Sequence, residues 1–329
     1  MDYFQALILG IVEGLTEYIP VSSTGHLILA KSFMGITQKA IDPYLIVIQG
    51  GAILAVLGLY RKRVAEMIRG LLGKNPVGLK LAINLIIAFL PAAVIGVLLN
   101  DLIDEWLMGT TPVIWALAIG GVLMLFAARW QRSAFHEGND SHSFIDIEHL
   151  TWKGALIIGF VQCFAMFPGT SRSMVTIVAS MGMGMKPKHA AEFSFLLGLP
   201  TLGGATVFKL YRDSDALSTL SMGPMILGII VAFFAAAIAI KWLVAYLSKH
   251  GLALFGWYRI ALAIIVAIYF WGDVNKESST LDGGIATSST VAPVTFENDH
   301  CPALPVAIQE TPSTITGPTA DCHLPVLIS

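Results

Sequence analysis

Charged side chains are scarce in this sequence: Asp, Glu, Lys and Arg together make up 13% of its 329 residues, whereas 55% are hydrophobic. Soluble domains usually carry about a quarter charged residues. An ordinary soluble globule is therefore excluded, as are a disordered chain and a nucleic-acid-binding protein built on a basic face. Cysteine is scarce too. With three cysteines, the chain holds neither a disulfide framework nor a cysteine-based zinc cluster.

Long apolar runs, by contrast, are abundant. The mean hydropathy is +0.73, and stretches close to the ~20 residues that a helix needs to cross a bilayer recur along the chain. Uninterrupted spans are predicted at 43–60, 83–99, 112–128, 190–208, 223–247 and 253–271. The predicted fold class is therefore an all-α polytopic membrane protein with six full transmembrane helices.

Two further apolar stretches, 4–34 and 155–185, are interrupted by polar and helix-breaking residues. Each is too long for one helix and too short for two spans, so we expect a re-entrant helical hairpin in each. ALILGIVEGLTEYIP in the first aligns with ALIIGFVQCFAMFP in the second when one residue is deleted, which places Ser23 on Ser171. Three predicted spans follow each copy. An odd number of crossings makes the second copy enter from the opposite face, which predicts an inverted repeat.

The distribution of charge predicts the orientation. Lys and Arg gather in the segments 61–82 and 129–154, whereas 100–111 has acidic residues and no basic one. Because cytoplasmic loops are enriched in Lys and Arg, we expect the first two segments in the cytoplasm. The N-terminus and the C-terminal tail then lie outside.

Composition also predicts the domain boundaries. We expect a membrane-embedded domain over 1–275, with repeat 1 at about 1–128 and repeat 2 at about 150–272. Residues 276–329 contain six acidic residues, one basic residue and 14 Ser or Thr. Such a composition without an apolar period predicts a flexible acidic tail.

Glu13 and Glu17 lie within the first interrupted stretch. Their i, i+4 spacing places them on one helical face, and an ionisable group inside a bilayer is costly unless it has a partner or a function. The pair could share a proton, bind a divalent metal ion, or divide the roles of base and acid. A solvated helix end is the structural alternative.

The first interruption ends in Val-Ser-Ser-Thr-Gly-His. Ser22, Ser23 and Thr24 are strong N-cap types, so a helix is predicted to begin here, and a helix start suits a phosphate group. His26 lies three residues after Ser23 and could act on its hydroxyl as a general base. The alternative is a set of capping serines beside an interfacial histidine.

Pro168-Gly169-Thr170-Ser171-Arg172-Ser173 repeats this design in the second stretch. Pro and Gly end one half-helix, the hydroxyl residues begin the next, and Arg172 adds a permanent charge suited to phosphate oxygens. Thr176 adds a hydroxyl on the same face. The alternative is an arginine that extends to the membrane surface.

Three other polar positions receive a structural interpretation. Gln49 and Glu192 lie in apolar spans and are expected to form interhelical hydrogen bonds. Tyr258-Arg259 is interpreted as an anchor at the membrane interface.

EGLTEYIPVSSTGH and PGTSRSMVT resemble the two signature motifs of the bacterial undecaprenyl-diphosphate phosphatases, the BacA/UppP family of bacitracin resistance. VIQGGAILAV, LPAAVIG and EFSFLLGLP are also similar, and the likeness covers about residues 1–272. It implies hydrolysis of undecaprenyl diphosphate to undecaprenyl phosphate and inorganic phosphate, which recycles the lipid carrier for peptidoglycan and other cell-wall glycans. It also implies a multi-pass protein of the bacterial inner membrane with an outward-facing site.

The resemblance carries residue roles with it. It implies a catalytic set of Glu13, Glu17, Ser23, His26 and Arg172, and substrate contacts from Ser22, Thr24, Thr170, Ser171, Ser173 and Thr176. Glu13 and Glu17 are expected to hold a divalent cation, Mg²⁺ or Ca²⁺. In this hypothesis Arg172 and the helix-start N–H groups hold the diphosphate, and His26, steered by Glu17, activates Ser23 for attack on phosphorus. A homodimer is a further possible assembly.

Two other functions compete with this reading. A prenyl-phosphate transporter or flippase would share the broken helices and inverted repeat, and hydrolysis without a gradient would exclude a pure transporter. A lipid phosphatase of the PAP2 type uses a phospho-histidine. Its motif requires a His and an Asp soon after Ser-Arg, whereas here His189 comes late.

Overall fold

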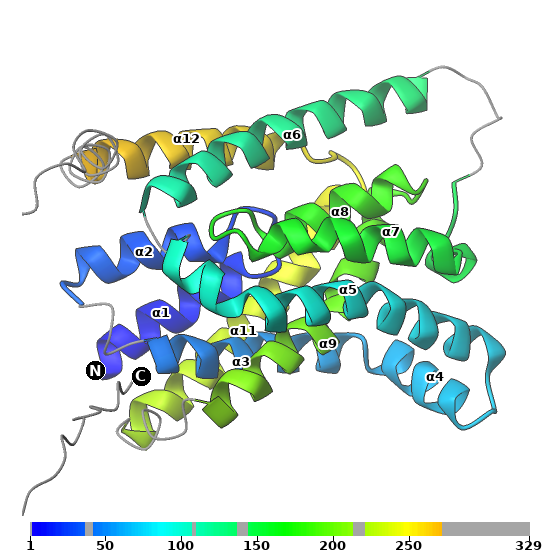
Figure 1. Cartoon of the computed structure of the whole chain (residues 1–329), viewed down its shortest axis with the longest axis horizontal. Helices are drawn as coiled ribbons and strands as arrows, with labels where there is room; N and C mark the ends of the chain where they lie inside the picture. The colour runs from blue at the N-terminus through cyan, green and yellow to red at the C-terminus, as the bar shows by residue number, and fades with distance from the viewer. Residues whose placement is uncertain (1, 37–41, 107–109, 137–143, 213–220, 272–329) are drawn as a thin grey trace, which may run out of the picture. The chain divides into compact units, whose positions relative to one another are not determined.

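The computed structural model describes residues 2–36, 42–106, 110–136, 144–212 and 221–271. The chain divides into two units, Met1–Gly283 and Gly284–Ser329, and all described residues belong to the first. The predicted tail at 276–329 lies outside the described residues. Within them the structure is helical (Figure 1).

The first half of the described chain contains α1 (Tyr3–Thr16), α2 (Ser23–Phe33), α3 (Asp42–Leu59), α4 (Arg61–Leu71), α5 (Pro76–Trp106) and α6 (Thr110–His136). The second half contains η2 (Ile147–His149), α7 (Trp152–Gln162), η3 (Cys163–Met166), α8 (Arg172–Gly182), α9 (Pro187–Arg212), α11 (Met222–Leu247) and α12 (Ala253–Tyr269). Each of the six predicted spans falls on a helix: α3, α5, α6, α9, α11 and α12.

Among the described residues, four segments are long and apolar enough to cross a membrane: Pro76–Leu98, Thr110–Trp130, Pro187–Phe208 and Met222–Leu247. The apolar parts of α3 and α12 are shorter, at Val47–Leu59 and Ala253–Tyr269. The protein is thus a multi-pass helical membrane protein. One segment differs from the prediction: the loop expected at 61–82 contains the charged helix α4 and the first turns of α5.

Both interrupted stretches are broken helices. α1 ends at Thr16 and α2 begins at Ser23, whereas α7 and η3 end at Met166 and α8 begins at Arg172. Ser22 and Ser171 are the two N-cap residues, and both have a φ of 72°. This left-handed conformation is uncommon for residues other than glycine. The helix start predicted near Ser22 is therefore confirmed.

The equivalent residue to Ser171 is Ser22, so the predicted equivalence of Ser23 and Ser171 is wrong by one position. The predicted alignment deletes one residue after Glu13, which shifts all the following pairs of residues by one position. A helix start is defined by the capping geometry and not by the preceding proline, and the capping geometry pairs Ser22 with Ser171. Ser23 therefore corresponds to Arg172, the first residue of its helix.

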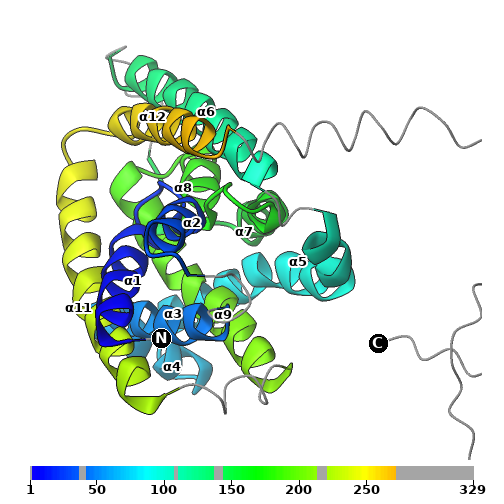
Figure 2. The same ribbon diagram turned by 90° about the vertical axis from the view of Figure 1, so that its left-hand side faces the viewer.

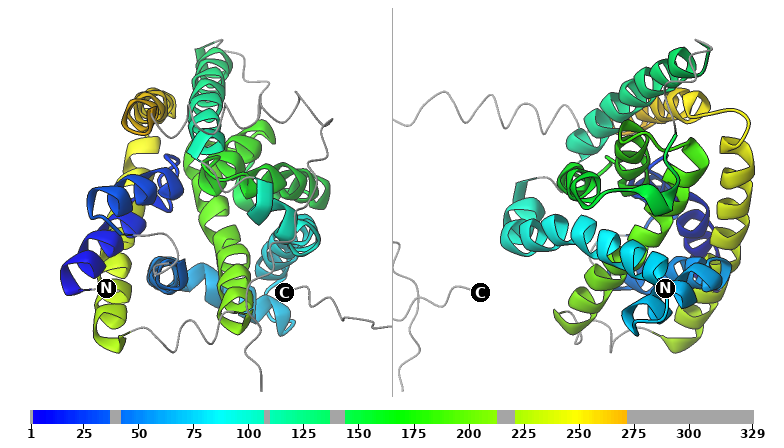
Figure 3. Two further views of the ribbon diagram at one scale, coloured as in Figure 1. Left: turned by 60° about the vertical axis from the view of Figure 1, so that its left-hand side comes forward. Right: turned by 90° about the vertical axis from the view of Figure 1, so that its right-hand side faces the viewer.

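The two halves pack against each other in reciprocal pairs. α1 contacts α11, and α7 contacts α5; α3 contacts α9, and α6 contacts α12. Figure 2 shows α1 lying along α11 and α6 beside α12. In the left view of Figure 3, α9 stands near the middle, and it contacts α3, α5, α8 and α11.

Glycines make these crossings close. A Cβ on Gly10 of α1 would lie 2.9 Å from the carbonyl oxygen of Gly228 in α11, and a Cβ on Gly159 of α7 would lie 2.6 Å from that of Ala88 in α5. Small residues at such contacts are how helices pack within a bilayer, where no hydrophobic force drives them together.

Candidate active site

The first carboxylates sit at the inner end of α1. Glu13 is 2% exposed, and Glu17, the residue that caps α1, is 8% exposed. The Glu17 N–H donates to the carbonyl oxygen of Glu13 at 2.9 Å, so both side chains leave the same face of one turn. Because apolar surroundings do not solvate two carboxylates, each of them requires a cationic partner or a proton.

Glu17 has both partners that it needs. Its Oε1 lies 3.2 Å from Nη2 of Arg172, and its Oε2 accepts a hydrogen bond from the Ser23 hydroxyl at 2.8 Å. One carboxylate thus joins α1, the start of α2 and the start of α8. The predicted convergence of the two interrupted stretches on one site is seen directly in these contacts.

Arg172 is held by α9 and by an aromatic ring, while its Nε is buried without a hydrogen-bond partner. Its Nη1 donates to the carbonyl oxygen of Ser194 in α9 at 2.8 Å, and its guanidinium lies 5.4 Å from the centre of the Tyr18 ring. The side chain is 10% exposed. A pair of buried charges such as Arg172 and Glu17 repays its desolvation only when its geometry and hydrogen bonds are good. The burial of this ion pair inside a membrane protein therefore indicates that the pair has a function.

The capping serines connect the two breaks further. Ser22 and Ser171 accept hydrogen bonds from the N–H groups of Gly25 and Met174, both at 3.4 Å. Ser173 donates to the carbonyl oxygen of Ile19 at 3.3 Å, from one break to the other. The starts of α2 and α8 therefore bring free N–H groups and hydroxyls to the surroundings of Glu17, a setting suited to an anion.

His26 lies differently from the prediction. Its Nδ1 is 2.8 Å from the carbonyl oxygen of Ser22, and its Nε2 is 2.7 Å from the hydroxyl of Tyr258. The Ser23 hydroxyl is bonded to Glu17. The predicted contact between His26 and Ser23 is therefore not made, because three residues of helical spacing bring two side chains near each other without fixing where each one points.

The three threonines predicted to contact the substrate differ in their surroundings. Thr176 is buried against α9, where its hydroxyl is 2.6 Å from that of Ser194. Thr24 is exposed at the start of α2, and Thr170 is half-buried in the second break. Thr24 and Thr170 can meet a ligand, whereas Thr176 fastens α8 to α9.

Two neighbouring residues of α12 reach both breaks. Tyr258 binds His26, and the two rings are stacked with an interplanar angle of 4°. Arg259 is fully buried and its Nη2 donates to the carbonyl oxygens of Gly169 and Ala116, each at 2.9 Å. Nε and Nη1 of Arg259 have no hydrogen-bond partner. The interpretation of this pair as an interface anchor is wrong for Arg259, and the missed signal was an arginine inside an apolar span.

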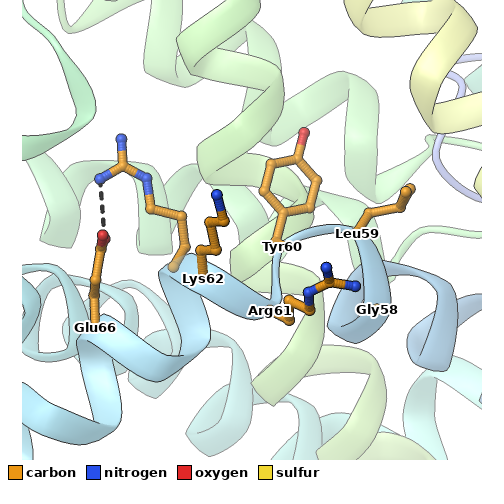
Figure 4. A pocket seen from close by; sticks show the side chains of 7 residues that line it. Gly58, Leu59, Tyr60, Arg61, Lys62 and Glu66 are labelled. Carbon is orange, nitrogen blue, oxygen red and sulfur yellow. Dashed lines mark hydrogen bonds and ion pairs between the residues drawn. The ribbon is translucent and has the colours of Figure 1, made fainter.

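The interhelical hydrogen bonds predicted for Gln49 and Glu192 are confirmed. Thr206 of α9 donates to Oε1 of Gln49 in α3 at 3.4 Å. Glu192 of α9 receives Nε of Arg63 at 3.2 Å, and Nη1 of Arg63 reaches Glu148 at 2.8 Å. Arg63 lines a cavity between the end of α3 and the start of α4, and Figure 4 shows Glu66 at the same cavity. These carboxylates raise the pKa of Arg63, so this ion-pair network fastens α4 to α9.

Glu13 and Glu17 are the residues expected to hold a divalent cation. Within the described part of the chain, no group of three His, Cys, Asp or Glu is arranged to hold a metal ion. However, Oε2 of Glu13 is buried and has no hydrogen-bond partner. A buried carboxylate oxygen without a partner suits a hard cation such as Mg²⁺ or Ca²⁺, so Glu13 has the chemistry that this prediction requires.

Fold and site together define a class: a multi-pass helical membrane protein in which two broken helices meet at a buried pair of acid and arginine flanked by serine hydroxyls. Comparisons with known proteins specify it further. Residues 6–265 match the family model described as bacitracin resistance protein BacA. The chain belongs to this family.

Individual proteins similar to this chain carry names from the same family. An undecaprenyl-diphosphatase of Sorangium cellulosum is 45% identical over 268 residues, which cover 81% of this chain and 86% of the relative. Undecaprenyl-diphosphatase 2 of Rhodospirillum rubrum is 41% identical over 84% of this chain and 97% of its own length. An undecaprenyl-diphosphatase of Ectopseudomonas mendocina is 41% identical over 80% and 92%.

Proposed function

We propose that this chain is a membrane phosphatase that hydrolyses undecaprenyl diphosphate to undecaprenyl phosphate and inorganic phosphate, and so recycles the lipid carrier of cell-wall synthesis. Its relatives carry the name of this activity, and the family name implies bacitracin resistance. The observation that carries the mechanism is the double contact of Glu17, with Arg172 on one oxygen and Ser23 on the other.

Arg172 is the residue that receives the substrate anion. Without a ligand its guanidinium is neutralised by Glu17. A diphosphate with more charge and more oxygens competes for the same fork, because guanidinium groups bind phosphate oxygens in a bidentate manner. The N–H groups at the starts of α2 and α8 add a positive potential from two directions.

Binding of the anion then frees Glu17 to act as a base. Its Oε2 already accepts the Ser23 hydroxyl proton in a hydrogen bond of 2.8 Å, which is the distance required for general-base catalysis. The Ser23 oxygen attacks the terminal phosphorus, the bond from that phosphorus to the bridging oxygen breaks, and undecaprenyl phosphate leaves. Water then hydrolyses the phosphoserine to inorganic phosphate and free Ser23.

His26 takes a positioning role in this mechanism. Both of its ring nitrogens are occupied, by the Ser22 carbonyl and by Tyr258, so it holds the turn that presents Ser23. This differs from the predicted role of His26 as the base.

Glu13 and Glu17 are the residues that would hold the divalent cation, Mg²⁺ or Ca²⁺. When bound, such an ion neutralises charge on the phosphate oxygens. The free oxygen of Glu13 supports this assignment.

The topology that we propose has six full spans and two re-entrant hairpins in an inverted repeat, within a membrane domain over 1–275. The reciprocal pairs α1–α11 and α7–α5 support it, since a two-fold relation between the halves produces pairs of this kind. The basic segment at 61–82 supports an inner-membrane orientation with the site facing outward. A homodimer stays a prediction.

Phosphate release from undecaprenyl diphosphate by the purified chain in detergent tests this function. We expect release that needs no ion gradient and that stops when a chelator is added. Release without a gradient contradicts a pure transporter or flippase, and absence of release with added Mg²⁺ and Ca²⁺ contradicts the phosphatase.

A further inference from the structure

A basic cavity lies where the chain leaves the apolar part of α3. It has a volume of about 450 Å³ and is lined by the last residues of α3 and the start of α4. Three of the lining residues, all of which the structure describes, are basic: Arg61, Lys62 and Arg63; Glu66 is the one acid among them. Because the apolar part of α3 ends at Leu59, the cavity lies at the level where a membrane-spanning helix meets the lipid headgroups.

The basic residues of this cavity differ in their partners. Arg63 is neutralised by three carboxylates at 2.8 to 3.3 Å, and Glu66 is one of these. Arg61 and Lys62 are exposed, and neither forms an ion pair with a residue that the structure describes. Figure 4 shows both side chains leaving the turn between the two helices. The cavity therefore keeps two uncompensated positive charges, which suit an anion such as a phosphate group.

An apolar stripe continues from this cavity along α4. Ile68 and Leu72 follow Arg61 by seven and eleven residues, so the three side chains share one face of the helix. Ile68 is 53% exposed, and Leu72, the C-cap residue of α4, is 66% exposed. Arg69 follows Lys62 by seven residues beside this stripe and is exposed as well. An exposed apolar stripe flanked by basic residues is typical of a helix that lies in the membrane interface.

The opposite face of α4 is fixed to the rest of the protein. Gly70 is buried there, and a Cβ on it would clash with the backbone of Leu79 in α5. Arg63 also joins α4 to α9, since its Nε lies 3.2 Å from Oε1 of Glu192. The cavity and the apolar stripe are therefore presented from a fixed position, with their cations and apolar side chains exposed.

We propose that this cavity and this stripe bind an anionic phospholipid of the adjoining membrane leaflet. Its phosphate lies between Arg61 and Lys62. Its acyl chains lie against Ile68 and Leu72. The occupant is a phospholipid because unpaired cations and exposed apolar side chains stand next to each other at the end of a span, which matches a charged headgroup followed by hydrocarbon. Basic pockets at the cytoplasmic ends of membrane helices bind such headgroups. This site does not depend on the phosphatase function proposed above.

Lipid binding by the purified full chain in detergent tests the site. The probe is fluorescent phosphatidylglycerol, whose headgroup carries one negative charge. We expect Arg61→Gln/Lys62→Gln to weaken its binding about tenfold, because two cations beside the phosphate are lost. Ile68→Ser/Leu72→Ser should weaken it about threefold, because the acyl chains lose apolar contacts. Phosphatidylcholine, which has no net charge, should bind the wild type about tenfold more weakly than phosphatidylglycerol. Equal binding of the two lipids contradicts the proposal.

Lys74→Gln/Lys80→Gln is the matched control. It removes the same charge from exposed residues of the same segment, but neither residue lines the cavity. Its affinity for phosphatidylglycerol should stay within about twofold of the wild type. An equal loss in both double variants would mean general attraction between the basic segment and the lipid. That result, or unchanged binding in Arg61→Gln/Lys62→Gln, overturns the site.

Two measurements on the wild-type chain distinguish a phospholipid from a free anion. Excess inorganic phosphate should leave most of the phosphatidylglycerol bound, because it lacks acyl chains, and complete displacement overturns the lipid assignment. Phosphatidylglycerol with a photoreactive headgroup should label the start of α4, whereas labels spread evenly over the lipid-facing helices contradict the site. Neither measurement requires hydrolysis of undecaprenyl diphosphate, so failure of this site and failure of the phosphatase are distinguishable.

Discussion

The two broken helices repeat one backbone design and differ in chemistry. Each has a packing glycine, Gly10 or Gly159, and each ends its break with a serine cap at a φ of 72°. Where the first carries the acid Glu13, the second carries the amide Gln162. One backbone design thus occurs twice, whereas the buried carboxylate occurs in the first broken helix and the arginine Arg172 in the second.

The largest effect on activity is expected from the loss of the Ser23 hydroxyl, which only the first broken helix supplies. We expect Ser23→Ala to lower kcat by about 10⁴-fold, because the hydroxyl that attacks phosphorus is removed. Ser32→Ala on the same helix is the control, since Ser32 is half-buried and its hydroxyl donates to that of Tyr269 at 3.4 Å. Both are measured by phosphate release, and wild-type turnover in Ser23→Ala would remove Ser23 from the mechanism.

Exchange of the acid and the amide between the two broken helices tests what Glu13 contributes. We expect Glu13→Gln to lower kcat by about 100-fold and to weaken the dependence on Mg²⁺ or Ca²⁺, because a cation ligand is lost. Gln162→Glu buries a carboxylate beside Ala88 and should lower the free energy of unfolding by ~3 kcal/mol. The dependence on the metal ion should stay unchanged. Metal titrations and thermal unfolding check both. An unchanged metal dependence in Glu13→Gln contradicts the assignment.

Tyr258 tests whether α12 positions the first half. We expect Tyr258→Phe to lower kcat by about tenfold, because His26 loses the hydrogen bond that orients its ring. The fall should appear in kcat at an unchanged Tm, which a purely structural role would not cause. Tyr269→Phe on the same helix is the control, and a wild-type kcat in Tyr258→Phe rejects the positioning role.

The smallest effect is expected far from the breaks. Arg63→Ala removes the ion pairs that fasten α4 to α9, but Arg63 is 29% exposed and its pairs are partly screened. We expect a fall in Tm of about 2 °C with kcat unchanged. A large loss of kcat would mean that this network acts on the site.

The sequence predicted the parts of the fold that depend on local composition. Apolar length located the six helices that contain the predicted spans, and Pro, Gly and Ser at the breaks located the helix starts. What it could not predict depends on side-chain direction. His26 was expected to bond Ser23 and instead bonds Ser22 and Tyr258, and Tyr258 lies 232 residues away in the chain.

The other wrong predictions concern contacts between residues far apart in the sequence. Arg259 was interpreted as an interface anchor, yet it is fully buried and bonds to α6 and to the second break. The one-residue error between Ser23 and Ser171 has the same origin, since alignment of letters does not record where a cap must be. The juxtaposition of Glu17 with Arg172, in contrast, follows from two breaks that meet.

The central claim is that the acid of one broken helix and the arginine of the other act on one phosphoryl group. It is tested by brief reaction with undecaprenyl diphosphate labelled in its terminal phosphate, followed by quenching in denaturing detergent at neutral pH, which preserves phosphoserine and phosphohistidine, and by peptide mapping. The account predicts labelled phosphoserine at Ser23 in the wild type and almost none in Arg172→Ala. Label on His26, or undiminished label at Ser23 without Arg172, would contradict it.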